Sequence, residues 1–153
     1  MIKKYISAIV SNAKNVLGFR TKRKIVVFSV DDYGNIRVNS KEARENMTNA
    51  GMPIYSRFAA LDTLETREDL EQLFEVLNSV QDKNGRSAVF TAFSLPCNIN
   101  FDKMEADDYR NYFYETLPET YEKLSIEQPE AYADTWKIWL AGMEKGFIKP
   151  QFH

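Results

Sequence analysis

The chain has 153 residues, 44% of them hydrophobic and 27% charged, which is typical of a globular domain with its own core. Its formal net charge is only −2, but the first 24 residues carry seven basic side chains and no acid. The remainder holds 13 basic and 22 acidic residues, and an acidic body argues against broad nucleic-acid binding. Cys97 is the only cysteine, which excludes an internal disulfide.

Residues 1–23 are predicted to form a basic amphipathic helix, because apolar residues recur at helical spacing. This apolar stripe consists of Ile2, Tyr5, Ile6, Ile9, Ala13, Val16 and Leu17. Two interpretations are open: the helix packs beneath the body of the protein, which we favour, or it lies on an anionic membrane surface. Polar residues interrupt the segment along the chain, so it lacks the unbroken apolar region of a signal peptide, and no cleavable signal peptide is predicted. No stretch reaches the roughly 18–20 apolar residues of a transmembrane segment, and a cytoplasmic or membrane-peripheral location is expected.

Residues 24–153 are predicted to form one domain that begins with a buried strand over residues 24–30. A helix is then expected from an Asn39 cap to Gly51. A firmer helix follows the capping sequence of residues 66–69 and places Leu70 and Leu77 on its core side. Residues 82–85 read as a turn and residues 87–93 as a second apolar strand. Strand, helix and strand at this spacing indicate a βαβ unit.

The second half continues the alternation with less regular signals. Residues 94–105 read as irregular, and helices are expected at residues 109–114 and 121–124. We interpret this tyrosine-rich interval as an insertion over the strand ends rather than a core element. A helix over residues 133–145 and a strand over residues 147–153 complete a βαβαβ pattern, which indicates an α/β fold. Because the chain then stops in what should be the middle of a sheet, the domain is expected to be truncated.

Two adjacent carboxylates, Asp31 and Asp32, follow the first strand, and the only histidine, His153, follows the last. The carboxyl ends of parallel strands meet at one edge of a sheet, so these three residues are expected to lie close together at that edge. Neighbouring carboxylates need a metal, a cation or a shared proton. Asp and His together suit zinc, nickel or cobalt. The structural alternatives are that the aspartates cap a turn and that His153 is a terminal side chain without a role.

The segment Phe28-Ser29-Val30-Asp31-Asp32-Tyr33-Gly34 resembles the first motif of the polysaccharide deacetylase group (NodB homology, carbohydrate esterase family 4), usually Thr-Phe-Asp-Asp-Gly. Pro150-Gln151-Phe152-His153 resembles the lead-in to that group's second motif, a His-x-x-x-His pair. Ser56-Arg57-Phe58 and residues 85–92 are similar to a branch of the wider glycoside hydrolase/deacetylase superfamily. The resemblance covers residues 24–153 and implies the N-terminal half of a distorted (β/α) barrel.

Carried over to this sequence, the resemblance implies that Asp31 is a general base and that Asp32 and His153 are ligands of a divalent metal, zinc in the first place. The implied reaction is metal-dependent removal of acetyl groups from a carbohydrate substrate. Tyr33 is inserted before Gly34, and the second histidine of the pair is absent. Two protein ligands are one short of the three usual at catalytic zinc. The chain is therefore expected to be an incomplete, inactive fragment, and its substrate-binding residues are not identified.

Two other functions remain open. A receiver-like phosphoacceptor domain also begins with a strand that ends in paired acids, but it needs a later aspartate where this chain has Ser94-Leu95-Pro96-Cys97. A non-enzymatic carbohydrate-binding or interaction module would stack aromatic rings on sugars, although the two tryptophans at helical spacing are expected in the core. The candidate rings are Tyr109, Tyr112, Phe113, Tyr114, Tyr121, Tyr132, Trp136 and Trp139.

Overall fold

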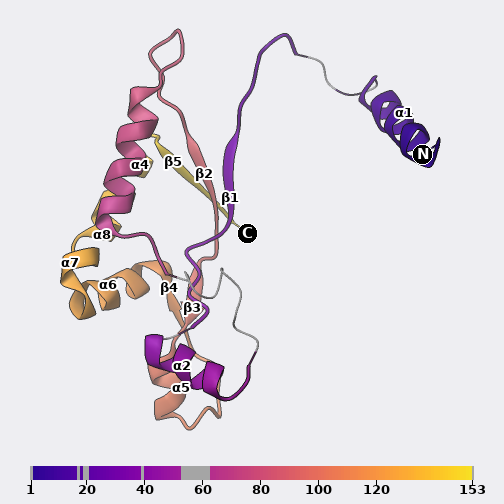
Figure 1. Cartoon of the computed structure of the whole chain (residues 1–153). Helices are drawn as coiled ribbons and strands as arrows, with labels where there is room; N and C mark the ends of the chain where they lie inside the picture. Colours follow the sequence, from indigo (N-terminus) through magenta and orange to yellow (C-terminus); the bar gives the residue numbers. More distant parts are fainter. Residues whose placement is uncertain (1, 17, 19–20, 39, 53–62, 153) are drawn as a thin grey trace.

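The computed structural model describes residues 2–16, 18, 21–38, 40–52 and 63–152, which form a mixed α/β structure (Figure 1). In chain order the elements are α1 (Ile2–Val16), β1 (Phe28–Tyr33), α2 (Lys41–Asn49), α4 (Arg67–Ser79), β2 (Phe90–Ser94), β3 (Cys97–Ile99), α5 (Phe101–Ala106), β4 (Tyr114–Thr116), α6 (Leu117–Glu127), α7 (Pro129–Tyr132), α8 (Thr135–Glu144) and β5 (Ile148–Phe152). The α/β prediction is confirmed.

The main sheet has three parallel strands in the order β1-β2-β5. Phe28 pairs with Phe90, and Phe90 pairs in turn with Ile148. The strands therefore lie side by side in the order in which the chain makes them. Strands β3 and β4 form a separate antiparallel pair beyond the end of this sheet (Figure 1).

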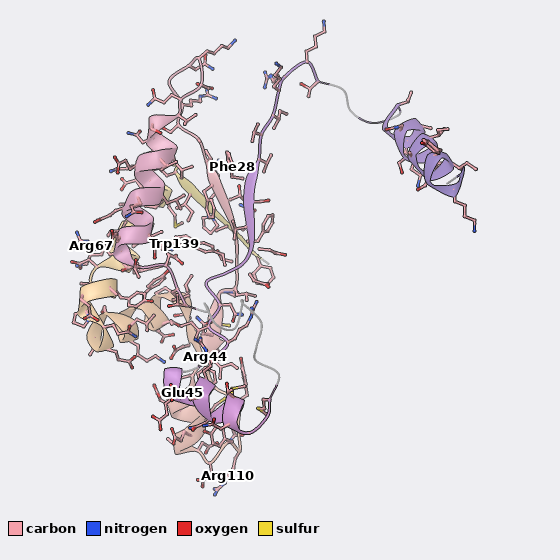
Figure 2. All side chains as sticks on the ribbon, in the orientation of Figure 1. Phe28, Arg44, Glu45, Arg67, Arg110 and Trp139 are labelled. Carbon is pink, nitrogen blue, oxygen red and sulfur yellow. The ribbon has the colours of Figure 1, made fainter. Side chains whose placement is uncertain are left out.

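The core lies on one face of the main sheet, between the strands and helices α4 and α8. Ala92 of β2 and Ile148 of β5 pack there with Leu70 of α4 and Trp139 of α8, and all four side chains are at most 1% exposed. Figure 2 shows Trp139 in the space between α4 and the strands. Both helices therefore cover the same face. Their predicted positions are confirmed, as is the capping box in which the Thr66 side chain accepts a hydrogen bond from the Asp69 backbone N–H.

The first strand differs from its prediction. Pairing begins only at Phe28, and β1 continues through both aspartates to Tyr33. The expectation of a buried strand is wrong, because Val26 is 77% exposed and Phe28 54% exposed. The physical reason is that the buried core takes its strand residues from β2 and β5, while the residues of β1 before Tyr33 are left uncovered.

The interval after β2 is more ordered and more buried than expected. Residues 97–106 hold β3 and α5 instead of an irregular segment. The helix predicted over residues 109–114 is wrong, because Asp108 and Tyr109 have φ values of 51° and 55°, which helical backbone excludes. The helix predicted at residues 121–124 forms as part of the longer helix α6, but Tyr121 is a core residue. The interpretation of this interval as a mere covering insertion is therefore wrong.

Two N-terminal predictions have different outcomes. Helix α2 forms, but Ser40 caps it by accepting a hydrogen bond from the Ala43 N–H, and Asn39 lies outside the described residues. Helix α1 also forms and lies apart from the sheet in Figure 1. Its described side chains are exposed, so the interpretation that it packs beneath the body is wrong. Within the described ranges, no helix has the length and apolar character needed to cross a bilayer.

Candidate functional site

The two aspartates lie at a bulge in β1. Val30 pairs with Ala92, and Tyr33 pairs with Ser94. The two aspartates therefore lie opposite one residue of β2, Phe93, which stands between Ala92 and Ser94. Asp32 has a left-handed backbone with φ 54°, which aspartate tolerates better than most residues. The bulge places two carboxylates at the carboxyl end of the strand while pairing resumes at Tyr33.

Asp31 lies on the face of the sheet opposite the helices, which we call the open face (Ser29, Asp31, Thr91 and Phe93). Ala92 points into the core, and strand alternation turns Thr91 and Phe93 the other way. Asp31, Ser29, Phe93 and the exposed Phe152 line a shallow depression of about 440 Å³. The predicted general base therefore lies beside a surface that a ligand can reach.

Asp32 makes an ion pair with Arg37, whose Nη2 lies 3.4 Å from Oδ2. Both side chains are about half exposed, at 44% for Arg37 and 50% for Asp32. Exposed pairs of this kind contribute about 0–1 kcal/mol. Arg37 can therefore give way when another cation approaches Asp32.

The loop that follows the aspartates is held by Asn98 of β3, a buried residue that is 4% exposed. Its Oδ1 accepts a hydrogen bond from the Ile36 N–H at 2.9 Å, and its Nδ2 donates to the Gly34 carbonyl at 3.0 Å and to Thr120 Oγ1 at 3.2 Å. Asn98 thus fixes the exit of β1 against β3 and α6. Sequence reasoning missed this residue, because the interval around it was read as irregular and its partners lie far away in the chain.

Gly34 fits this loop for a steric reason as well. Its φ is 87°, and a Cβ there would lie 3.1 Å from both Cδ atoms of Leu117. A side chain at this position would therefore meet both backbone strain and a packed neighbour.

The described residues do not complete a metal site. Asp31 and Asp32 supply oxygen donors of the right chemistry, but no group of three or more His, Cys, Asp or Glu residues suited to a metal occurs within the described ranges. His153, the other predicted ligand, lies outside the described residues. Phe152, the residue before it, pairs with Ser94 at the level of Tyr33, which places the ends of all three strands together.

A second polar cluster lies on the helix-covered face. Trp139 Nε1 donates a hydrogen bond to Glu65, whose carboxylate also lies beside the hydroxyls of Tyr33 and Tyr121. Burial, followed by this carboxylate, raises the pKa of both tyrosines above the ordinary range. Among the described residues, the Tyr121 hydroxyl makes no hydrogen bond, although it lies close to the Glu65 carboxylate. The cluster ties the segment before α4 to β1 and α8.

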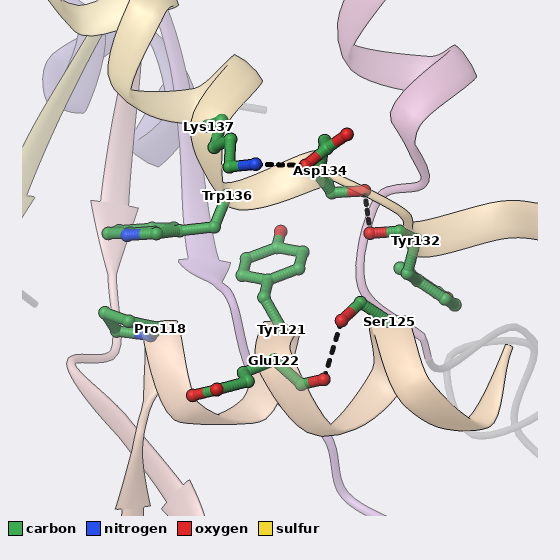
Figure 3. Close-up of a pocket in the computed structure, with 9 residues that line it drawn as sticks. Pro118, Tyr121, Glu122, Ser125, Tyr132, Asp134, Trp136 and Lys137 are labelled. Carbon is green, nitrogen blue, oxygen red and sulfur yellow. Dashed lines mark hydrogen bonds and ion pairs between the residues drawn. The ribbon is translucent and has the colours of Figure 1, made fainter. Parts of the chain in front are cut away.

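A third feature is an open pocket of about 340 Å³ between α6, α7 and α8 (Figure 3). Pro118, Tyr121 and Trp136 form its apolar side, and the ion pair between Asp134 and Lys137 lies at its edge. The Trp136 ring stacks on Tyr121 with centroids 5.9 Å apart. Trp136 therefore packs against the core and also lines the pocket.

The other aromatic candidates divide by exposure. Tyr109, Tyr112 and Tyr114 are 61–66% exposed, whereas Tyr132 and Trp139 are buried. The expectation that the tryptophans belong to the core is confirmed for Trp139. These three exposed candidates, Tyr109, Tyr112 and Tyr114, lie in the segment between α5 and α6.

Comparisons of the chain with protein-family models, with curated protein sequences and with solved structures found no match.

Proposed function

We propose that the chain carries the N-terminal half of a distorted (β/α) barrel of the polysaccharide deacetylase type, whose activity is metal-dependent hydrolysis, and that it holds only part of the active site. The observation that supports this most is the arrangement around the sheet. The strands follow chain order, both core helices lie on one face, and Asp31 lies on the other face near the carboxyl end of β1. In (β/α) barrels the helices form the outer layer and the catalytic groups come from the carboxyl ends of the strands.

The strand order also favours this proposal over a receiver-like domain. A receiver-like sheet has the order 2-1-3, in which the first strand lies between the next two. Here β2 is the central strand and β1 is at the edge. In a barrel each new strand is added on the same side of the one before it, as β2 and β5 are here. In the receiver-like order the second and third strands lie on opposite sides of the first.

In this proposal Asp31 accepts a proton at a carboxylate oxygen, and Asp32 and His153 are ligands of a divalent metal. The carboxyl ends of β1 and β5 are two strand spacings apart, or roughly 10 Å, a gap that Asp and His side chains can span toward a common ion. When bound, such a metal polarises an acetyl carbonyl and acidifies a water. The donor set among the described residues is incomplete, so tight zinc binding at micromolar concentration is not expected.

A carbohydrate-binding module without catalysis is the second candidate. Its support is the exposure of Tyr109, Tyr112 and Tyr114, which carry large rings into solvent on one segment. Such rings suit stacking on sugar faces, because a tyrosine can keep its hydroxyl in water.

Cobalt(II) titration of the full chain, followed by visible absorbance, tests the metal part. Weak binding that needs high cobalt concentrations is expected, and it should be lost in Asp32→Asn and in His153→Gln. Glu75→Gln removes an exposed carboxylate from α4 and is the matched control, in which binding is retained. Binding that survives both site variants would contradict the proposed ligands, and tight stoichiometric binding would contradict the incomplete site.

NMR titration with an acetylated oligosaccharide and its deacetylated form tests the substrate part. Cobalt-dependent shifts around Ser29, Thr91 and Phe93 with the acetylated form only are the expected result. Metal-independent shifts at Tyr109, Tyr112 and Tyr114 would instead favour the binding module. Shifts at neither place would reject both candidates.

A further inference from the structure

Helix α1 presents an apolar stripe that the structure leaves exposed. Four residues of the stripe, Tyr5, Ile6, Ile9 and Val16, and the neighbouring Val10 are 49–67% exposed. The helix has 15 residues, which is close to the length of about 12–15 residues below which an isolated helix is marginal in water. A partner surface that buries this stripe would therefore also stabilise the helix.

The charges around the stripe are all of one sign. Lys3 and Lys14 are exposed on α1, and Lys22, Arg23 and Lys24 follow it, also exposed. No acidic residue occurs in the first 24 residues, whereas the rest of the chain has an excess of nine acidic residues. The partner of this segment is therefore expected to combine an apolar layer with negative charge.

We propose that α1 and the basic residues 22–24 bind the surface of an anionic lipid bilayer and attach the domain to it. Apolar side chains of an amphipathic helix enter the boundary between head groups and acyl chains, while lysines at its edge contact the anionic head groups. Clustered basic residues beside such a helix add electrostatic attraction that falls off within a Debye length. A second copy of the chain suits this segment less well, because two such segments would repel each other.

Co-sedimentation of the full chain with lipid vesicles tests the proposal. Binding is expected to vesicles of mixed phosphatidylcholine and phosphatidylserine, weaker binding to pure phosphatidylcholine, and loss of binding at high salt. Ile6→Asp combined with Ile9→Asp should abolish binding. Replacement of Lys3 and Lys14 by Gln should weaken the partition coefficient about fivefold for each charge removed.

Matched variants outside α1 distinguish binding by this helix from nonspecific binding of the rest of the protein to vesicles. Val76→Asp changes an apolar residue of α4 that is 62% exposed, and Lys83→Gln with Lys145→Gln removes two exposed charges. These variants should bind vesicles as the unchanged protein does. Equal binding to both vesicle types, binding retained in the isoleucine variant, or no vesicle binding would each overturn the proposal. Self-association in solution that the isoleucine variant removes, without vesicle binding, would assign the stripe to a second copy instead.

Discussion

Helices α1 and α4 look alike in sequence and differ in the structure. Both are amphipathic and of similar length, with 15 and 13 residues. In α4 the apolar side is buried against the sheet and α8, and Leu70 is 0% exposed and Leu77 6% exposed. In α1 every described side chain is exposed. The comparison teaches that apolar spacing predicts a helix with two unlike sides, while the neighbouring elements decide whether the apolar side is covered.

Matched truncations of the two helices should give the largest contrast. Leu70→Ala is expected to lower the free energy of unfolding by about 2–5 kcal/mol, because it removes a fully buried side chain and leaves a cavity. Ile9→Ala should change it by less than about 0.5 kcal/mol, because Ile9 is 67% exposed. Urea unfolding measures both. A large loss from Ile9→Ala would show that α1 packs on the body in solution.

The contact of α4 with α8 should be sensitive to a single methyl group. A Cβ on Gly142 of α8 would overlap the Phe74 ring of α4, so Gly142→Ala is expected to cost about 1–3 kcal/mol. Helix propensity alone predicts the opposite sign, a gain of roughly 0.8–1 kcal/mol. Thermal and urea unfolding give the sign directly. A second variant that combines Gly142→Ala with Phe74→Leu should recover part of the loss.

Alkaline pH should destabilise the buried cluster around Glu65. Below about pH 10 both the folded and the unfolded chain keep the phenol protons of Tyr33 and Tyr121, so the raised pKa values have no effect. Above that pH the unfolded chain releases them and the folded chain does not, so stability falls by about 1.4 kcal/mol per pH unit for each tyrosine. Urea midpoints measured from pH 9 to 11 should show this decrease.

Phenylalanine variants identify the groups responsible for that decrease. Tyr33→Phe and Tyr121→Phe should each make the pH dependence shallower. Tyr5→Phe in α1 should leave it unchanged, because the Tyr5 side chain is 66% exposed. An equal slope in all three variants would assign the alkaline destabilisation to other groups, such as lysines.

The helices that cover one face of the sheet were largely predictable from the sequence, because the patterns that predict them are local. Capping residues, helical spacing and turn residues lie within a few positions of one another, and the structure confirms α4, α8 and the turn at residues 82–85 on that basis. The apolar run before the aspartates was misread for the opposite reason. β-branched residues predict a strand, but the sequence does not show that the strand lies at an edge where the helices leave it exposed.

The candidate site was predictable only in part. The aspartate pair and its place near the end of β1 follow from a short motif, whereas the bulge depends on the register with β2. The Asn98 contacts with Gly34 and Ile36 join residues more than sixty positions apart, and no local pattern marks them. Glu65 was missed for the same reason, because its neighbours Tyr33 and Trp139 come from β1 and α8.

The smallest expected loss of stability concerns the start of α4. It tests whether this helix is stabilised more by its capping box or by the packing of its apolar side. Thr66→Ala removes the oxygen that accepts from the Asp69 N–H and is expected to cost about 1 kcal/mol. Thr66→Ser keeps that oxygen and should retain most of the stability. Because helix stability in proteins comes mainly from packing of the apolar side, the loss should stay well below that of Leu70→Ala. A cap loss as large as the core loss would mean that α4 depends on its own capping box more than on the sheet, and the contrast with α1 would then rest on local sequence rather than on coverage.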